Sequence, residues 1–125
     1  MKRACMGLRT FQIYTAFLLF ISLAALPAES ADSVSQEIDH LLQYIESSGC
    51  IFIRNGKEKN AADALAHIQI KYDYSKSRVK TTEDFIKYAA TKSSMSGKPY
   101  KVRCGGREIR TADWLYTELQ KLRNN

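Results

Sequence analysis

Residues 93–108 read SSMSGKPYKVRCGGRE, and this stretch decides the fold. A loop rich in hydroxyl groups, residues 93–99, leads into a segment in which Tyr100, Val102 and Cys104 alternate with basic residues. Alternation with a period of two is typical of a strand that buries one face. Two glycines then turn the chain. The stretch therefore predicts a loop, a half-buried strand with a cysteine at its end, and a tight turn.

An earlier stretch repeats these features. Cys50–Arg54 is a short apolar strand, Asn55-Gly56 is the strongest two-residue hairpin signal, and Lys57–Lys59 would return as a charged edge strand. The pattern G-[KR]-E-x3-A-D-x-L begins at Gly56 and again, 50 residues later, at Gly106. Duplication and chance convergence both remain open. Either origin predicts two β-hairpins, each followed by a helix.

The first 30 residues are typical of an export signal. Lys2, Arg3 and Arg9 precede an apolar segment, residues 16–26, and small residues follow it. This segment is shorter than the roughly 20 residues that a spanning helix needs. We therefore expect a signal peptide, residues 1–30, a periplasmic or secreted protein, and a single compact domain over residues 31–125. The alternative is an uncleaved membrane anchor, which the intact mass of the exported protein would reveal.

The charge of the chain limits its partners. The formal net charge is +6, and loss of the first 30 residues, which carry three basic residues and one acidic residue, lowers it to +4. A charge of this size gives a weak bias toward anionic partners. Export argues against nucleic acid as the partner, and we expect no stable membrane insertion after signal cleavage. The oligomeric state is not indicated.

Two cysteines remain after processing, because Cys5 lies in the signal segment. In an oxidising compartment such a pair most simply forms one disulfide. We expect a Cys50–Cys104 bond whose removal costs about 2–5 kcal/mol of stability. The alternatives are a redox thiol or a metal site. They lack support, because the chain has no CxxC motif and only two isolated histidines, so we predict no metal and no cofactor.

The expected disulfide also fixes the direction of the two strands, if they are neighbours. In a parallel pair the cysteines would lie about 13 Å apart, beyond the roughly 7 Å that a disulfide spans between Cα atoms. An antiparallel pair places Cys50 opposite Cys104 and Phe52 opposite Val102. The offset of 50 maps this register onto itself. We therefore expect a local two-fold axis and a four-stranded antiparallel sheet with the two return strands at its edges.

Apolar residues at helical spacing predict four helices. Their expected ranges are Ser33–Ser48 with Ser33 as the cap, Asn60 to about Lys76, Thr81 or Thr82 to Lys92, and Thr111 as the cap of a last helix. We place His40 on the solvated face of the first helix. The predicted fold class is α+β: a small antiparallel sheet of two hairpins, packed against about four helices and closed by one disulfide.

Cationic and hydroxyl-bearing residues near the turns form the candidate ligand site. The candidates are Arg54, Asn55, His67, Lys71, Ser94, Ser96, Lys98 and Tyr100. Cations, hydroxyls and loop N–H groups suit a carboxylate, a phosphate or an acidic polymer. The alternative is a solvated loop whose serines satisfy their own backbone. In that case His67 belongs to a surface charge ladder with Asp63 and Lys71.

Known catalytic motifs are missing from the sequence. Ser94 and Lys98 are four residues apart, so the S-x-x-K spacing does not occur, and neither does G-x-S-x-G. The chain also lacks a phosphate-binding P-loop, H-E-x-x-H and an EF-hand loop. We therefore favour a binding or interaction module for an anionic ligand or an envelope protein. The alternative is a periplasmic hydrolase or transferase that uses a loop serine with His67.

Three segments carry a resemblance to known proteins: FIRNG at Phe52–Gly56, TEDFI at Thr82–Ile86 and SGKPY at Ser96–Tyr100. Through them the chain resembles a family of small exported proteins of Gram-negative bacteria that is known only as a domain of unknown function. The resemblance spans about Asp32 to Leu122. It implies export and one compact domain, and it supplies no catalytic residue.

Overall fold

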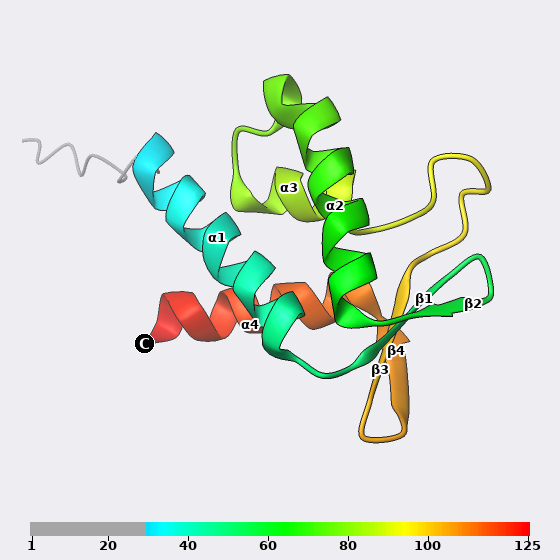
Figure 1. Cartoon of the computed structure of the whole chain (residues 1–125). Helices are drawn as coiled ribbons and strands as arrows, with labels where there is room; N and C mark the ends of the chain where they lie inside the picture. The colour runs from blue at the N-terminus through cyan, green and yellow to red at the C-terminus, as the bar shows by residue number, and fades with distance from the viewer. Residues whose placement is uncertain (1–29) are drawn as a thin grey trace, which may run out of the picture.

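The computed structural model describes residues 30–125. Its elements follow one another (Figure 1) as α1 (Ala31–Ser47), β1 (Ile51–Arg54), β2 (Lys57–Lys59), α2 (Ala61–Ser75), the 3-10 turn η1 (Lys76–Arg78), α3 (Thr82–Ala89), β3 (Lys101–Cys104), β4 (Arg107–Arg110) and α4 (Thr111–Asn124). The fold class is α+β, as predicted. The expected signal peptide, residues 1–30, lies outside the described residues except for Ser30. None of the helices described is both long and apolar enough to cross a membrane.

The four strands form one antiparallel sheet in the order β2-β1-β3-β4. In the central pair, Phe52 lies opposite Val102 and Ile51 lies opposite Arg103, which is the predicted register. The two return strands, β2 and β4, are the edges, as expected. Register and strand order therefore agree with two hairpins related by a local two-fold axis between Phe52 and Val102.

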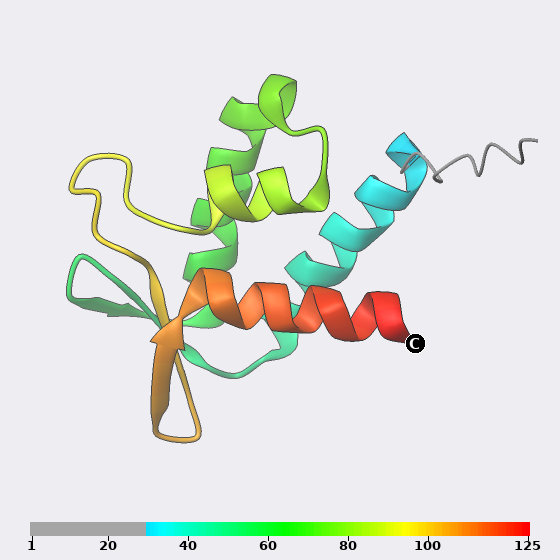
Figure 2. The same ribbon diagram turned by 180° about the vertical axis from the view of Figure 1, so that it is seen from behind.

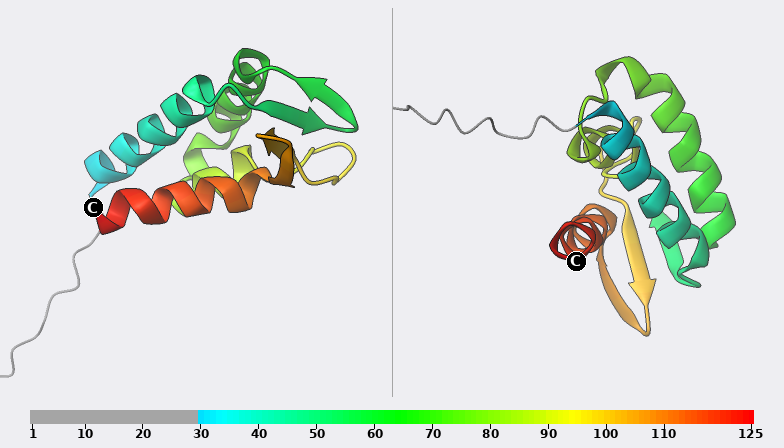
Figure 3. Two further views of the ribbon diagram at one scale, coloured as in Figure 1. Left: turned by 90° about the horizontal axis from the view of Figure 1, so that it is seen from below. Right: turned by 90° about the vertical axis from the view of Figure 1, so that its left-hand side faces the viewer.

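The offset of 50 extends beyond the hairpins. α2 begins at Ala61 and α4 begins at Thr111, each directly after its hairpin. α1 precedes the first hairpin and α3 precedes the second, so each half has the order helix, hairpin, helix. In the left view of Figure 3, α1 and α4 both extend away from the hairpins toward the side where the C-terminus lies.

The core lies between one face of the sheet and the helices. Phe52 and Val102 supply the sheet side, and both are buried. The helices supply Val34, Ile38, Leu41, Ile45, Ala64, Ile68, Phe85, Ile86, Ala89, Ala90, Leu115 and Leu119. Trp114 stacks on Tyr44 with ring centroids 4.4 Å apart and meets the edge of Phe52 at 5.7 Å. The apolar residues that the sequence places on one face of α1 are therefore the residues that the core buries.

Local signals set the turns as predicted. Asn55 and Gly56 both have positive φ, 52° and 74°, which is the requirement of the hairpin turn that an Asn-Gly pair favours. The Asn60 side chain caps α2 by accepting from the N–H of Asp63 at 2.8 Å. Thr81 caps α3 and forms a reciprocal capping box with Asp84.

Three helix ends differ from the prediction. Ser30 rather than Ser33 is the N-cap of α1, because the Ser30 hydroxyl accepts from the N–H of Ser33 at 3.3 Å. α3 ends at Ala89 rather than Lys92, since Lys92 forms a bridge with Pro99 and that pairing turns the chain away from the helix axis. The third difference is at α4. Thr111 is its first residue rather than its cap, and it donates its N–H to the carbonyl of Tyr100 at 2.9 Å.

His40 differs as well. It is half-buried rather than solvated, and its Nε2 lies 2.9 Å from Oε1 of Glu118. This contact joins α1 to α4. The prediction missed it because the partner is 78 residues away in the chain, and helical periodicity reports only the face of one helix.

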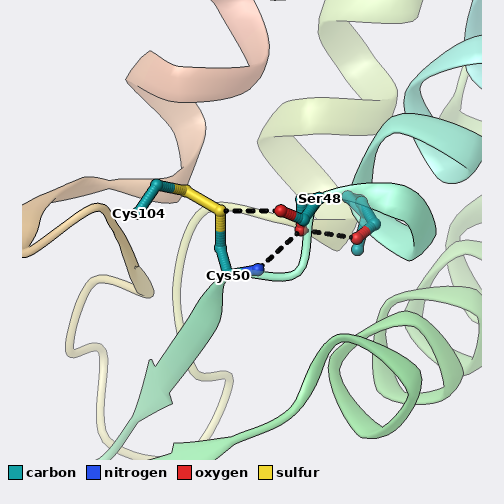
Figure 4. Close-up of a disulfide and its surroundings, with 4 residues drawn as sticks. Ser48, Cys50 and Cys104 are labelled. Carbon is teal, nitrogen blue, oxygen red and sulfur yellow. Dashed lines mark hydrogen bonds between the residues drawn. A yellow bond between two sulfur atoms is a disulfide. The ribbon is translucent and has the colours of Figure 1, made fainter.

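The disulfide is present as predicted. Cys50 and Cys104 are bonded, with their Cα atoms 4.8 Å apart (Figure 4). The backbone N–H of Cys50 donates to the hydroxyl of Ser48 at 3.2 Å, which fixes the link between α1 and β1. The disulfide therefore connects the link between α1 and β1 to the end of β3.

Candidate functional site

A cavity of about 300 Å³ lies where α2 passes over β1 and the start of β3. Buried apolar side chains from the core line part of it. The lining residues are Phe52, Ile53, Arg54, Lys59, Asp63, Ala64, His67, Ile68, Tyr100 and Thr111. Cavities that bind small molecules cover roughly 300–1,000 Å³ and combine apolar walls with a few polar groups. This cavity has that composition and lies at the small end of the range.

Four of the candidate residues form one chain of contacts, and three of them line the cavity. Nη1 of Arg54 lies 2.7 Å from Nδ1 of His67, and Nε2 of His67 lies 3.0 Å from the hydroxyl of Tyr100. Nζ of Lys71 donates to the same hydroxyl at 3.2 Å and to the carbonyl oxygen of Lys92 at 2.5 Å. We call Arg54, His67, Lys71 and Tyr100 the basic cluster.

The periodicity of the elements brings the basic cluster together. Arg54 lies two residues after Phe52 in β1, and Tyr100 lies two residues before Val102, so both side chains share the face that covers the core. His67 and Lys71 are one helical turn apart on α2 and therefore lie on the same side of that helix. The sheet and α2 thus present the four side chains to each other.

Burial and neighbouring charges set the protonation of the cluster. The pKa of His67 is lowered by burial and then by the positive charges of Arg54 and Lys71. The pKa of Lys71 is lowered by burial and by Arg54 and Lys92. Burial raises the pKa of Tyr100, and Arg54 opposes this in part. Nη1 of Arg54 also lies 2.9 Å from Nε2 of His67. A neutral His67 with its hydrogen on Nε2 accepts from Arg54 through Nδ1, the shorter of the two contacts, and donates to the Tyr100 oxygen.

The cluster has more donors than acceptors. Among residues 30–125, no carboxylate forms an ion pair with Arg54 or Lys71. The Tyr100 oxygen already accepts from Lys71 and His67, so its own hydrogen is available to a further acceptor. Asp63 is the one carboxylate among the lining residues, and Lys59 lines the cavity with it. The arrangement therefore suits a small anionic group, which would accept several charge-assisted hydrogen bonds.

A buried hydroxyl borders the same cavity. Thr111 is 1% exposed, lines the cavity, and its Oγ1 has no hydrogen-bond partner within the described residues. A buried polar group without a partner is uncommon and calls for an explanation such as a bound molecule. This hydroxyl is thus a second polar feature at the cavity, apart from the basic cluster.

Two other candidates connect the first hairpin to the loop. The Ser96 hydroxyl donates to Oδ1 of Asn55 at 2.5 Å, and Nδ2 of Asn55 donates to the Ser93 hydroxyl at 3.4 Å. In Figure 2 the loop after α3 and the tip of the β1–β2 hairpin lie close together. Asn55 and Ser96 therefore brace the loop beside the basic cluster rather than belong to it.

Ser94 and Lys98 are not brought to the basic cluster. Both are exposed. Lys98 lines a second hollow together with Asn55, Pro99 and Lys101, and Ser94 joins none of the contacts described above. Their positions follow from the loop, whose sequence carries no periodicity that could have placed them.

The contacts do not pair His67 with a serine. Within the part of the chain that the structure describes, His67 contacts Arg54 and Tyr100, whereas the loop serines contact Asn55 and the loop backbone. The same residues contain no group of three or more histidine, cysteine or acidic side chains that could hold a metal ion.

Several lining residues were not predicted as part of a site. Phe52 and Ile68 were expected only as core residues of a strand and a helix, Asp63 was expected only in the alternative charge ladder, and Ala64 was given no role. One signal was present in the sequence: the offset of 50 places Ala64 where the other half has Trp114. A small residue that replaces a large aromatic one at related positions of a repeat indicates space at that point.

Comparison with known proteins agrees with the resemblance noted in the sequence. The model of a family of unknown function, DUF5329, matches residues 32–123. A relative, the uncharacterized protein YfeK of Salmonella typhimurium (strain LT2), is 41% identical over 49 residues, which cover 39% of this chain and 41% of that protein. The match thus spans less than half of the relative's length. No solved structure matches the chain. Because the family match covers most of the chain, this protein belongs to DUF5329, a family of unknown function.

Proposed function

We propose that the protein is a binding module that holds the anionic group of a small ligand at the basic cluster. The observation that supports this most directly is the surplus of hydrogen-bond donors in the basic cluster. Arg54 and Lys71 have no carboxylate partner among residues 30–125, and the Tyr100 hydroxyl still has a hydrogen to donate. An anion completes these interactions.

Each member of the cluster has a distinct role in this proposal. Arg54 supplies a planar fork of N–H groups, which matches the oxygens of a carboxylate or a phosphate. Tyr100 donates its hydroxyl hydrogen to the same group. Lys71 holds the Tyr100 oxygen at 3.2 Å and adds positive charge, while His67 stays neutral and aligns Arg54 with Tyr100.

We further propose that the protein functions outside the cytoplasm, in the periplasm or as a secreted protein. The Cys50–Cys104 bond supports this compartment, since disulfides persist mainly in oxidising environments. An envelope protein that presents a carboxylate is the alternative source of the anion. Titration with small anions separates a small ligand from a protein partner. A small ligand site binds a free anion by itself, whereas a protein partner needs contacts beyond its carboxylate.

The test is an NMR titration of the purified protein with sodium acetate and with inorganic phosphate. We expect saturable amide shifts at Arg54, His67 and Tyr100 for at least one of the two anions. Arg54→Gln should abolish them, because it removes the charged fork and keeps much of the side-chain volume.

Arg103→Gln is the matched control for this substitution. Arg103 is an arginine of the neighbouring strand β3 and forms an ion pair with Glu58 instead. Arg103→Gln should therefore leave the amide shifts in the titration unchanged. Saturable binding that survives Arg54→Gln, or shifts that map to Arg103, would contradict the proposed site.

A further inference from the structure

The cavity has a counterpart in the other half of the molecule, and the counterpart is filled. The offset of 50 that relates the two hairpins carries Ala64 to Trp114, Arg54 to Cys104, and Tyr100 back to Cys50. At the counterpart, the two cysteines form the disulfide. There the indole of Trp114 packs against Phe52 and Tyr44. The same place in the first half has only the methyl group of Ala64.

The difference at Ala64 explains why the cavity is there. Both hairpins bury one face under a helix that begins directly after the return strand, α2 in the first half and α4 in the second. In the second half the ring of Trp114, from the first turn of α4, packs against Phe52 of the sheet and Tyr44 of α1. In the first half the space above the sheet is open, and Phe52, Ala64 and Ile68 line it.

We infer that the ligand is an aromatic carboxylate, whose ring occupies this space beside Ala64 and whose carboxylate meets Arg54 and Tyr100. This inference rests on the proposed function and adds the class of ligand. The ring lies beside Phe52 and Ile68, which line the cavity together with Ala64. Aromatic pairs of this kind gain from offset or edge-to-face contact in addition to burial.

The position of the charges agrees with a ligand that is anionic at one end only. Arg54 and Tyr100 lie next to each other at one end of the central strand pair, as Cys50 and Cys104 do at the other end. The cationic fork and the hydroxyl therefore lie together at one end of the cavity. Away from the basic cluster, the cavity is lined by apolar side chains and by the partnerless hydroxyl of Thr111, and Lys59 and Asp63 are the remaining charged residues of the lining. A fully polar anion such as phosphate would leave the apolar walls in contact with water, and a neutral ring would leave the donors unpaired.

The experiment compares three probes by NMR titration and calorimetry: indole-3-acetate, which has ring and carboxylate, acetate, which lacks the ring, and 3-methylindole, which lacks the carboxylate. We expect indole-3-acetate to bind at least about tenfold more tightly than either of the others, because burial of the ring and pairing of the charge both contribute. Its shifts should include the amides of Ala64 and Thr111 as well as those of the basic cluster.

A substitution that fills the cavity tests the location of the ring. Ala64→Trp copies the residue of the other half and should weaken binding of indole-3-acetate by more than about tenfold. Ala62→Trp is the matched control, because Ala62 is an exposed alanine of the same helix, and it should bind as the parent does. If Ala64→Trp does not give a folded spectrum, Ala64→Leu provides the same test with a smaller side chain.

The outcomes separate this inference from the proposed function. If acetate binds as tightly as indole-3-acetate and binding depends on Arg54, the anion site stands and the aromatic ligand is wrong. The aromatic ligand is also wrong if Ala64→Trp, or Ala64→Leu in its place, binds indole-3-acetate with unchanged affinity. If neither indole-3-acetate nor acetate nor phosphate binds, the proposed function falls together with the inference.

Discussion

Tyr100 is the single residue that connects most parts of the candidate site. Its hydroxyl is contacted by His67 and Lys71 from α2. Its backbone N–H donates to the carbonyl of Thr91 at 3.0 Å, and its carbonyl accepts from the N–H of Thr111 at 2.9 Å. The residue is only 6% exposed; α2 holds its side chain, and the segment after α3 and the start of α4 hold its backbone. Tyr100 therefore fixes the geometry of the basic cluster.

His67 should make stability depend on pH near neutrality. Its pKa in the folded protein is below the ordinary value of about 6.5, owing to burial, Arg54 and Lys71. Between the two values the unfolded chain binds a proton that the folded chain does not, so the free energy of unfolding rises with pH there. We therefore expect stability to fall as the pH drops from about 6.5 toward the lowered pKa.

Urea unfolding at a series of pH values measures this effect, with His67→Gln as the comparison. The variant should show a smaller loss of stability in that window. Both proteins should lose stability again at lower pH, because hydrogen bonds from Arg123 lower the pKa values of Glu37 and Glu83, and that contribution disappears as these carboxylates are protonated. An identical pH profile near neutrality in the two proteins would contradict the role of His67.

The two buried threonines that begin helices should respond in opposite ways to loss of their hydroxyl. Thr82 begins α3 and donates to Glu37, so Thr82→Val should lower the free energy of unfolding by about 1–3 kcal/mol. Thr111 begins α4 and its hydroxyl has no partner in the described chain. Thr111→Val should therefore leave stability unchanged or raise it by about 1 kcal/mol.

Chemical unfolding of both valine variants at the same pH checks this expectation, and each serves as the control of the other. A larger loss for Thr111→Val than for Thr82→Val would show that the Thr111 hydroxyl has a partner, for example an ordered water in the cavity.

Part of the site could be predicted at the residue scale. Arg54 and Tyr100 follow from the two-residue period of a strand, and His67 with Lys71 from the four-residue spacing of a helix, so regular structure made their positions computable. Ser94 and Lys98 belong to an irregular loop, and no local rule places a side chain there. The partner of His40 could not be predicted either, because the contact depends on the packing of α1 against α4.

At the scale of elements, the turn signals were more reliable than the helix ends. An Asn-Gly or Gly-Gly pair has few conformations that close a hairpin, so the turn residues fix both the turn and the register. A helix can begin at any of several hydroxyl residues, and Ser30 and Ser33 both fit the chemistry of a cap. In this protein α1 begins at Ala31, and the hydroxyl of the preceding Ser30 accepts from the N–H of Ser33.

The two hairpin turns provide a matched pair of substitutions. Both turns have positive φ at their two central residues: Asn55 and Gly56 in the first, Gly105 and Gly106 in the second, at 58° and 78°. Gly105→Asn copies the first turn and should change the free energy of unfolding by less than about 0.5 kcal/mol. Gly56→Val places a β-branched residue at a φ of 74° and should cost about 1–2 kcal/mol or more.

Thermal or chemical unfolding of the two glycine variants decides the matter. A Cβ atom at either position would meet no neighbouring atom within 4 Å, so we expect the difference to reflect mainly the backbone conformation. Equal stabilities for Gly56→Val and Gly105→Asn would contradict the requirement for positive φ at the first turn.

At the scale of the whole molecule, the offset of 50 is the strongest piece of information in the sequence. A disulfide between Cys50 and Cys104 is compatible with only one direction of two neighbouring strands, and this gave the register. The offset maps that register onto itself and so predicted the order of all four strands. It could not predict the cavity with the same certainty. Related positions hold different residues, and whether Ala64 leaves open space depends on how the neighbouring side chains of both halves pack.

The same offset predicts that the disulfide can be moved to its counterpart. Arg54 and Tyr100 are the images of Cys104 and Cys50, and the intervening pairs are in register. Cysteines at these two positions should therefore come as close as Cys50 and Cys104, whose Cα atoms are 4.8 Å apart. We expect Arg54→Cys with Tyr100→Cys to form a second bond, seen as the loss of two thiols in an intact-mass and thiol-labelling experiment.

The stability of a relocated bond is the quantitative form of this prediction. Replacing Cys50 and Cys104 by serine should lower the free energy of unfolding by about 2–5 kcal/mol. Adding cysteines at positions 54 and 100 to that variant closes a loop of 46 rather than 54 residues in sequence separation. Loop-closure entropy depends only on the logarithm of the loop length, so oxidation should stabilise the variant with cysteines at 54 and 100, relative to its own reduced form, by about as much as the native bond contributes. Unfolding under oxidising and reducing conditions measures this difference, which excludes the contacts that are lost when Tyr100 is replaced. Two free thiols in the folded variant would mean that the chain at Arg54 and Tyr100 departs from the two-fold relation that the central strands obey.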